Sequence, residues 1–300
     1  QDILKELPVR DVISWNALIT GYAQLEQGHD AMNCFEQMKN DGISPNAVTF
    51  IGVLKACGCI GAINEGKQIH IEIVTKGLLN EDVVLGTALM DMYAKCGLVA
   101  KAQEVLEELP VRNVISWSTL IVGYTHKGQG HEALECFERM QREGLSPDPV
   151  AYVCILQACG NARDIDKGKQ IHEDIVINGL FERVAVLGNA IVDMYAKCGV
   201  LAKAQEVLER LPVRSIVSWS ALIAGYAEQG QCQQALNCFE QMQSEGISPN
   251  AVTLICILKA CGNIGATMNG EQIHEEIMSR NLLMKDIELG NALIDMYAKC

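Results

Sequence analysis

The heptapeptide DMYAKCG occupies residues 91–97 and returns unchanged at 193–199, and its first six letters close the chain at 295–300. These copies are 102 residues apart, and the stretch AKAQEVLE keeps the same spacing, beginning at Ala100 and again at Ala202. Self-similarity at a fixed period is the sequence signature of a repeat architecture. The chain is therefore expected to be built from one unit of 102 residues used repeatedly.

Each unit divides into subunits of 35, 36 and 31 residues, and each subunit reads as two short helices. Trp15, Leu18 and Tyr22 fall at helical spacing, which predicts an amphipathic first helix. Gly42 and Pro45 stand where the second helix should stop. No segment alternates like a strand, and hairpins of this size must stack to share a core. The predicted fold class is all-α, a right-handed superhelical α-solenoid of tandem helix-turn-helix repeats.

Composition narrows the possible functions. No run of about eighteen apolar residues exists, so no transmembrane helix is expected. The chain starts without Met, a basic segment or an apolar segment, so it is expected to be a fragment whose targeting segment lies elsewhere. The formal charge of −13 argues against a general nucleic-acid binder, because phosphate contacts need a basic surface. Most of the thirteen cysteines follow the period, which favours small buried hydrophobes in a reducing compartment over disulfides or zinc ligands.

Three longer motifs recur with the period: SWNALITGYA from Ser14, TFIGVLKACG from Thr49 and GNALIDMYAKC from Gly290. They resemble the pentatricopeptide repeat family, specifically its plant PLS subclass of P, long and short repeats, and the pattern covers essentially the whole chain. One repeat solenoid is predicted over 1–300. Its P repeats are 12–46, 114–148 and 216–250; its long repeats are 47–82, 149–184 and 251–286; its short repeats are 83–113 and 185–215, with a short-repeat tail at 1–11 and a truncated short repeat at 287–300.

The resemblance implies sequence-specific binding of single-stranded RNA, one base per repeat. In the family the fifth and last residues of a repeat form the specificity pair. Here the pairs are Asn16 with Asn46, Thr87 with Asn113, Ser118 with Asp148, Asn189 with Ser215 and Ser220 with Asn250, while Asn291 lacks its partner. Amides and hydroxyls can donate to and accept from a base edge, and the smaller ones leave room for a purine. The long repeats carry Ile51, Val153 and Ile255 at the fifth position and are assigned no base. The predicted target is 5′-Y-n-A-G-n-C-A-n-Y-3′.

Two further sets of residues follow from the resemblance and the period. The residue at position two packs against base faces in the family, which assigns that role to Ile13, Val84, Ile115, Val186 and Val217. The competing interpretation is that these apolar residues belong to the core. Lys95, Lys197 and Lys299 recur eight residues after a specificity residue and are candidate phosphate contacts, or else solvated lysines near a helix end. Acidic residues such as Glu104 are expected on the second helices, away from the residues of the specificity pairs, which we call readers.

Enzymatic interpretations find little support. His70-Ile71-Glu72 matches half of a cytidine-deaminase signature, but no P-C-x-x-C follows, and the histidine is one of a periodic set. No catalytic residue, cofactor or metal is expected.

The sequence therefore predicts an RNA-binding module that selects a plant organellar transcript, in plastid or mitochondrion, for C-to-U editing by a domain outside this chain. A small editing-factor protein is an expected partner at the long repeats. The alternative is a peptide-binding scaffold of the tetratricopeptide kind, which the spacing of Trp117, Leu120 and Tyr124 faintly resembles. Natural duplication and a consensus-like engineered array both remain possible origins.

Overall fold

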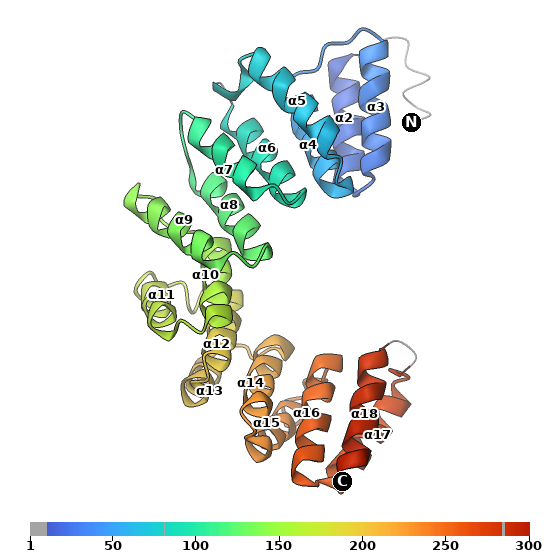
Figure 1. Cartoon of the computed structure of the whole chain (residues 1–300), viewed down its shortest axis with the longest axis vertical. Coiled ribbons are helices and arrows are strands. Elements are labelled where there is room, and N and C mark those ends of the chain that lie inside the picture. The colour runs from blue at the N-terminus through green and yellow to red at the C-terminus, as the bar shows by residue number, and fades with distance from the viewer. Residues whose placement is uncertain (1–10, 81, 284–285) are drawn as a thin grey trace. The chain divides into compact units, whose positions relative to one another are not determined.

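The computed structural model describes residues 11–80, 82–283 and 286–300, which form two compact units, one ending at Cys154 and the other beginning at Ile155. Within these described ranges the regular structure consists of α-helices and one 3₁₀ turn, with no strand (Figure 1). The predicted all-α class is confirmed. The same described ranges contain no helix long and apolar enough to cross a membrane.

The first unit stacks four helical hairpins and begins a fifth. Its helices are α2 (Val12–Gln24), α3 (Gly28–Asn40), α4 (Ala47–Ile60), α5 (Ile63–Thr75), the 3₁₀ turn η1 (Leu78–Asn80), α6 (Val83–Lys95), α7 (Val99–Glu108), α8 (Val114–His126) and α9 (Gly130–Arg142). Helix α10 (Pro149–Ala162) contains the boundary between the units. The second unit continues with α11 (Ile165–Ile177), α12 (Ala185–Lys197), α13 (Leu201–Arg210), α14 (Ile216–Glu228), α15 (Cys232–Ser244), α16 (Ala251–Ile264), α17 (Thr267–Ser279) and α18 (Ile287–Lys299).

The first helix of every predicted repeat begins at that repeat's first residue. Those starts are Val12, Ala47, Val83, Val114, Pro149, Ala185, Ile216, Ala251 and Ile287. The predicted short-repeat tail at 1–11 lies outside the described residues except for Asp11, which caps α2 by accepting a hydrogen bond from the Ser14 N–H. One continuous domain over 1–300 stays a prediction.

Helices form two rows within each unit. In the first unit, the first helices α2, α4, α6 and α8 pack side by side in chain order, and each second helix packs on its own hairpin partner or the next first helix. In the second unit, α12, α14, α16 and α18 form the corresponding row (Figure 1). The core lies between the rows, where Trp15, Phe35, Trp117 and Phe137 are almost completely buried. The first row is the one that carries the predicted reader residues.

Several turns that follow a helix contain a residue in the left-handed backbone conformation. Gly42 has φ 72° just beyond the end of α3, as its place in the sequence predicts, because a residue without Cβ adopts this conformation without strain. Within the long repeats, Gly61 and Gly265 cap α4 and α16 in the same conformation. Arg163 takes that place in the middle long repeat, with φ 56°.

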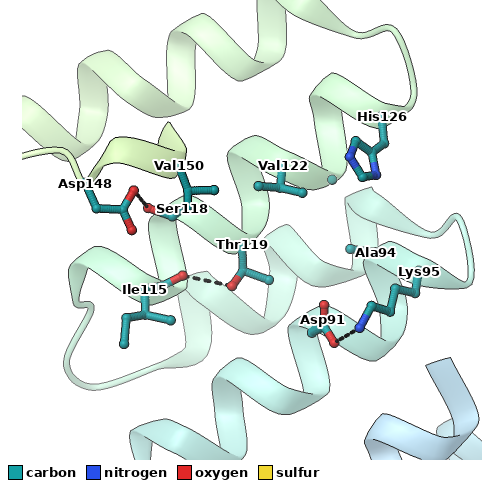
Figure 2. A pocket seen from close by; sticks show the side chains of 11 residues that line it. Asp91, Ala94, Lys95, Ile115, Ser118, Thr119, Val122, His126, Asp148 and Val150 are labelled. Carbon is teal, nitrogen blue, oxygen red and sulfur yellow. Dashed lines mark hydrogen bonds and ion pairs between the residues drawn. The ribbon is translucent and has the colours of Figure 1, made fainter. Parts of the chain in front are cut away.

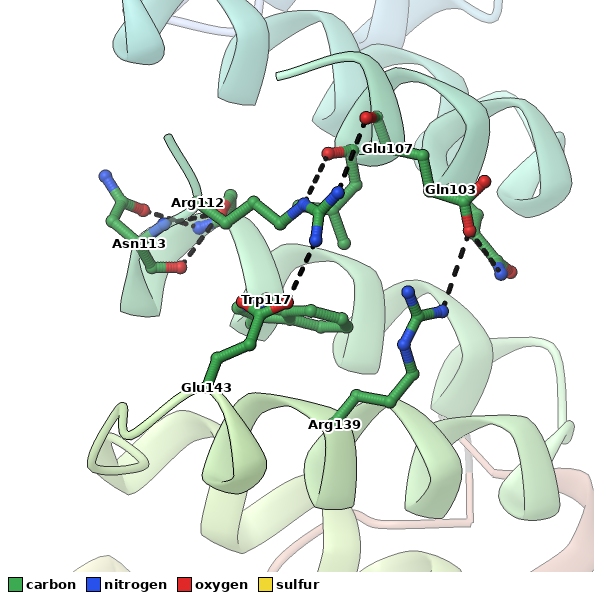
Figure 3. Close-up of polar contacts among 9 residues, drawn as sticks. Gln103, Glu107, Arg112, Asn113, Trp117, Arg139 and Glu143 are labelled. Carbon is green, nitrogen blue, oxygen red and sulfur yellow. Dashed lines mark hydrogen bonds and ion pairs between the residues drawn. The ribbon is translucent and has the colours of Figure 1, made fainter. Parts of the chain in front are cut away.

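A polar cluster joins each later P repeat to the short repeat before it. Trp117 Nε1 donates to Glu143 Oε2 at 2.9 Å, and Arg112 pairs with the other oxygen of that carboxylate at 2.9 Å. The Arg139 guanidinium lies 5.3 Å from the centre of the Trp117 ring (Figure 3). The cluster recurs with Trp219, Arg214 and Glu245. Burying the tryptophan therefore leaves its N–H satisfied.

Cysteine burial is less uniform than the sequence suggests. Cys34, Cys57 and Cys136 are buried among apolar side chains, as expected. By contrast, Cys96 and Cys198 cap helices and are only half-buried, and each thiol lies 3.8–3.9 Å from a backbone carbonyl of the preceding long repeat. These two cysteines recur with the period because they occupy the same helix end in each short repeat, not because they occupy a core position.

Candidate nucleic-acid interface

The last residue of a repeat is also the N-cap of the next first helix. Asn46, Asn113 and Ser215 each accept a hydrogen bond from the backbone N–H three residues on, and Asp148 Oδ1 accepts from the Ala151 N–H at 2.8 Å. Asn, Asp and Ser are the preferred residues at this position because their side-chain oxygens satisfy a free N–H. The cap occupies one side-chain oxygen of each of these residues and leaves Nδ2 of Asn46 and Asn113 and Oδ2 of Asp148 for other partners.

In the first unit, two of the three predicted pairs are joined directly. Asn16 Nδ2 donates to Asn46 Oδ1 at 3.0 Å, and Ser118 Oγ donates to Asp148 Oδ1 at 2.9 Å. Thr87 differs, because its hydroxyl donates to the Val83 carbonyl oxygen of its own helix at 2.9 Å. Hence the fifth and last residues of both P repeats in this unit meet, whereas the Thr87 hydroxyl is used locally.

In the second unit, one pair is direct and one is bridged. Ser215 Oγ donates to Asn189 Oδ1 at 3.2 Å. Ser220 reaches Asn250 through Thr253, whose hydroxyl oxygen lies 2.6 Å from Ser220 Oγ and donates to Asn250 Oδ1 at 2.9 Å. The unpartnered reader Asn291 lies exposed on α18.

Every predicted position-two residue is exposed, so none of them is a core residue. Their exposed fractions are 73% for Ile13, 64% for Val84, 63% for Ile115, 58% for Val186 and 56% for Val217. The long repeats expose the same position, a feature the sequence prediction left out: Val48, Val150 and Val252 are 52%, 52% and 58% exposed. The sequence could have indicated this feature, because a valine occupies position two of all three long repeats.

A cleft of about 270 Å³ brings these elements together in the first unit (Figure 2). The hydrogen-bonded pair Ser118 and Asp148 forms its polar wall, while Ile115 and Val150 line it from the P repeat and the following long repeat. Lys95 also lines the cleft, from α6. A cleft with both a polar wall and exposed apolar side chains suits a flat ring that is recognised by its edge and packed on its faces.

The lysines of the short repeats have partners on their own helices. Lys95 Nζ lies 2.7 Å from Asp91, and the equivalent distances are 2.8 Å from Lys197 to Asp193 and 2.6 Å from Lys299 to Asp295. The carboxylate neutralises part of the charge that a phosphate would need. A phosphate contact by these lysines stays a prediction, with Lys95 the best placed because it borders the cleft.

Acidic residues of the second helix α7 pair with basic residues on second helices. Glu104 pairs with Lys101 on α7, and Glu107 lies 3.6 Å from Arg139 on α9 (Figure 3). None of these four residues belongs to the first helices that carry the readers. Glu104 and Glu107 thus lie on a second helix, as the sequence predicts.

The periodic histidines hold the long and short repeats together. His70 Nδ1 lies 2.9 Å from the Tyr93 hydroxyl, and His172 and Tyr195 repeat the contact at 3.0 Å. Burial lowers the pKa of both imidazoles. The bond to tyrosine accounts for the periodic histidine, and the described residues contain no group of three or more His, Cys, Asp or Glu side chains that could hold a metal ion.

These features define a helical-repeat protein of the α-solenoid class, with regularly spaced polar readers. Sequence profiles sharpen that class: the PPR repeat family matches residues 10–59, 112–161 and 214–263, and a PPR repeat matches 87–114. The chain belongs to the pentatricopeptide repeat family.

Relatives agree with this assignment. A chloroplastic pentatricopeptide repeat-containing protein of Arabidopsis thaliana is 37% identical over all of this chain and 48% of its own length. A mitochondrial one from the same plant is 38% identical over 87% of this chain and 41% of its own length. The chain thus spans about half the length of these relatives, and their names confirm the predicted plastid or mitochondrial setting.

The fold is also that of a solved structure. The crystal structure of the pentatricopeptide repeat protein PPR10 from maize matches with a TM-score of 0.81 at 21% identity, covering 99% of this chain and 43% of that one. PPR10 in complex with an 18-nt psaJ RNA element matches with a TM-score of 0.82 at 20% identity, over 99% and 44%. At these identities the match establishes the shared fold.

Proposed function

We propose that this chain is a sequence-specific module for single-stranded RNA that reads one base per P or short repeat. The observation that carries the proposal is the cleft that is lined by the bonded pair Ser118–Asp148 and by the exposed side chains of Ile115 and Val150. Support comes from the PPR10 structure, a protein of the same fold in complex with RNA. No catalytic step is assigned to this chain.

The polar chemistry of the Ser118–Asp148 pair favours guanine. The Ser118 hydroxyl uses its hydrogen on Asp148 Oδ1, so its lone pairs and Asp148 Oδ2 present only acceptors. The Watson–Crick edge of guanine carries adjacent N–H donors, which acceptors of this kind would bind. This supports G at the fourth position of the predicted target 5′-Y-n-A-G-n-C-A-n-Y-3′.

Organellar C-to-U editing is the biological role that we propose for the complete protein, with the deaminating domain outside this chain and the P-long-short order as that of the PLS subclass. A small editing-factor protein would dock at the long repeats. Exposed apolar side chains on their second helices support such a partner, including Ile71 on α5, Ile177 on α11 and Met268 on α17. A pulldown that still succeeds after all three long repeats are replaced by P repeats would contradict this docking site.

Fluorescence anisotropy tests the RNA proposal directly. The probes are labelled UUAGUCAUU, the same RNA with A3 and G4 exchanged, and the DNA counterpart, each at two salt concentrations. We expect tighter, salt-weakened binding of the first RNA, because each misread base should cost on the order of 1 kcal/mol or more, by analogy with protein–DNA sites.

Two other outcomes discriminate between parts of the proposal. Equal binding of both RNAs would overturn the residue assignments while retaining an RNA-binding surface. Absence of binding to any probe would overturn RNA recognition by this chain and favour the tetratricopeptide-like peptide scaffold.

A further inference from the structure

Two threonines outside the predicted specificity pairs touch the readers of P repeats. Thr49 and Thr253 are the third residues of the long repeats that follow the first and third P repeats, and both are completely buried. Each lies in the first turn of its helix, next to the N-cap reader Asn46 or Asn250. The middle long repeat has Ala151 at this place.

Thr49 fixes the orientation of the Asn16 amide. Its hydroxyl lies 2.6 Å from Asn16 Oδ1 and 3.1 Å from Asn46 Oδ1 and donates its one hydrogen to the nearer oxygen, while Asn16 Nδ2 donates to Asn46 Oδ1 at 3.0 Å. Asn46 Oδ1 also accepts from the Thr49 N–H at 3.1 Å. An amide flip would place an N–H of Asn16 against the threonine donor and its oxygen against that of Asn46. The network therefore leaves Asn16 and Asn46 with N–H groups as their free donors.

Thr253 relays a hydrogen bond between Ser220 and Asn250. Asn250 Oδ1 accepts from both the N–H and the hydroxyl of Thr253, at 2.9 Å each. That hydroxyl has only one hydrogen, and either hydroxyl can donate in the 2.6 Å contact between Thr253 and Ser220. When Thr253 donates to Asn250, Ser220 donates to Thr253 and keeps free lone pairs, while Asn250 keeps free N–H groups; together these match the donor and acceptor of an adenine edge.

The middle P repeat shows why its long repeat needs no threonine. Asp148 offers a carboxylate oxygen directly to Ser118 at 2.9 Å, and the Ala151 N–H completes the cap at 2.8 Å. A carboxylate has no N–H end and cannot present the wrong group by flipping. An asparagine can, so the threonines accompany the two P repeats that end in Asn46 and Asn250.

We infer that Thr49 and Thr253 are positioning residues, which orient the donors and acceptors of the P-repeat readers and thereby set base preference from the neighbouring long repeat. The inference rests on the proposed RNA function and gives the long repeats a role in reading, although Ile51 and Ile255 at their fifth positions make no polar base contact.

Thr253→Val tests the inference at nucleotide 7 of UUAGUCAUU. Anisotropy with A, G, C or U at that nucleotide gives the base preference, and thermal melting followed by circular dichroism reports folding. We expect the wild-type preference for A over C, roughly tenfold by analogy with mismatched base pairs, to fall to about twofold or less in Thr253→Val. Thr253→Ser keeps the hydroxyl and should keep the preference.

Thr125→Val is the matched control, because the Thr125 hydroxyl donates to the Ile121 carbonyl oxygen of its own helix at 2.8 Å. It should bind all four RNAs as the wild type does. An unchanged preference in a folded Thr253→Val, or a preference lost equally in Thr253→Ser, would overturn the positioning role. A wild-type protein without any preference at nucleotide 7 would instead overturn the proposed reading itself.

Discussion

The two junctions of a long repeat use the same helix stacking for different purposes. Where a P repeat meets a long repeat, polar readers such as Ser118 and Asp148 bond to each other beside exposed apolar residues. Where a long repeat meets a short repeat, contact is close and mostly apolar: a Cβ on Gly66 would lie only 2.6 Å from the Met92 sulfur. The first junction keeps polar groups free for a ligand, whereas the second holds the repeats together.

The largest expected effect comes from a substitution that disrupts the packing of a long repeat against the following short repeat. Met92 is completely buried, so Met92→Ala should lower the free energy of unfolding by about 2–5 kcal/mol through lost burial and a cavity. Urea denaturation followed by circular dichroism measures this loss. The control Met268→Ala, at a side chain 76% exposed, should leave stability nearly unchanged. Equal losses in the two variants would contradict the structural role of this junction.

Asp148→Asn should change base preference at the P–long junction while sparing stability. Asparagine caps a helix as well as aspartate does, but it adds N–H donors to a face that otherwise only accepts. The ratio of binding to G and A at nucleotide 4 should shift toward A by about 1–3 kcal/mol, measured by anisotropy. Asp164→Asn alters another capping aspartate, on α11, and should shift nothing. A guanine preference retained by Asp148→Asn would refute the reader assignment.

Truncating an apolar wall of the cleft should weaken binding without changing preference. Ile115→Ala removes a side chain that is 63% exposed, so we expect a loss of about 1 kcal/mol for every base at nucleotide 4 and little change in melting. Ile71→Ala, 65% exposed on a second helix, serves as the control in the same anisotropy assay. A loss confined to one base would show that Ile115 discriminates rather than packs.

The smallest expected effect is a pH dependence of stability that comes from histidines at the long–short junctions. The pKa values of His70 and His172 lie below the ordinary value of about 6.5, so the unfolded chain takes up protons first as pH falls. Stability should therefore decrease below about pH 6.5, the more so because none of the described residues bonds to the buried His70 Nε2. Melting temperatures between about pH 7.5 and 5.5 measure the slope. The variant His70→Gln/His172→Gln should show a flatter slope, and an identical slope would exclude these histidines as its source.

Reader positions could be predicted because they follow the repeat. Asn16 and Asn46 lie 30 residues apart, and only the family resemblance suggested that they meet, which the 3.0 Å bond between them now shows. The same pattern suggested a comparable pair in Thr87 and Asn113, yet the Thr87 hydroxyl bonds within its own helix. Sequence position alone cannot decide which acceptor a hydroxyl finds, because a helix always offers a carbonyl one turn back.

Periodicity by itself determined the helical class, the length of the unit and the helix starts, because burial every three or four residues and the capping residues are local properties. The tertiary structure alone decided that Ile115 and Val150 are exposed around one cleft and that Lys95 pairs with Asp91. It also decided that Thr49 supports Asn16 from the neighbouring repeat. These contacts depend on how successive hairpins stack, and stacking joins residues that no local pattern relates.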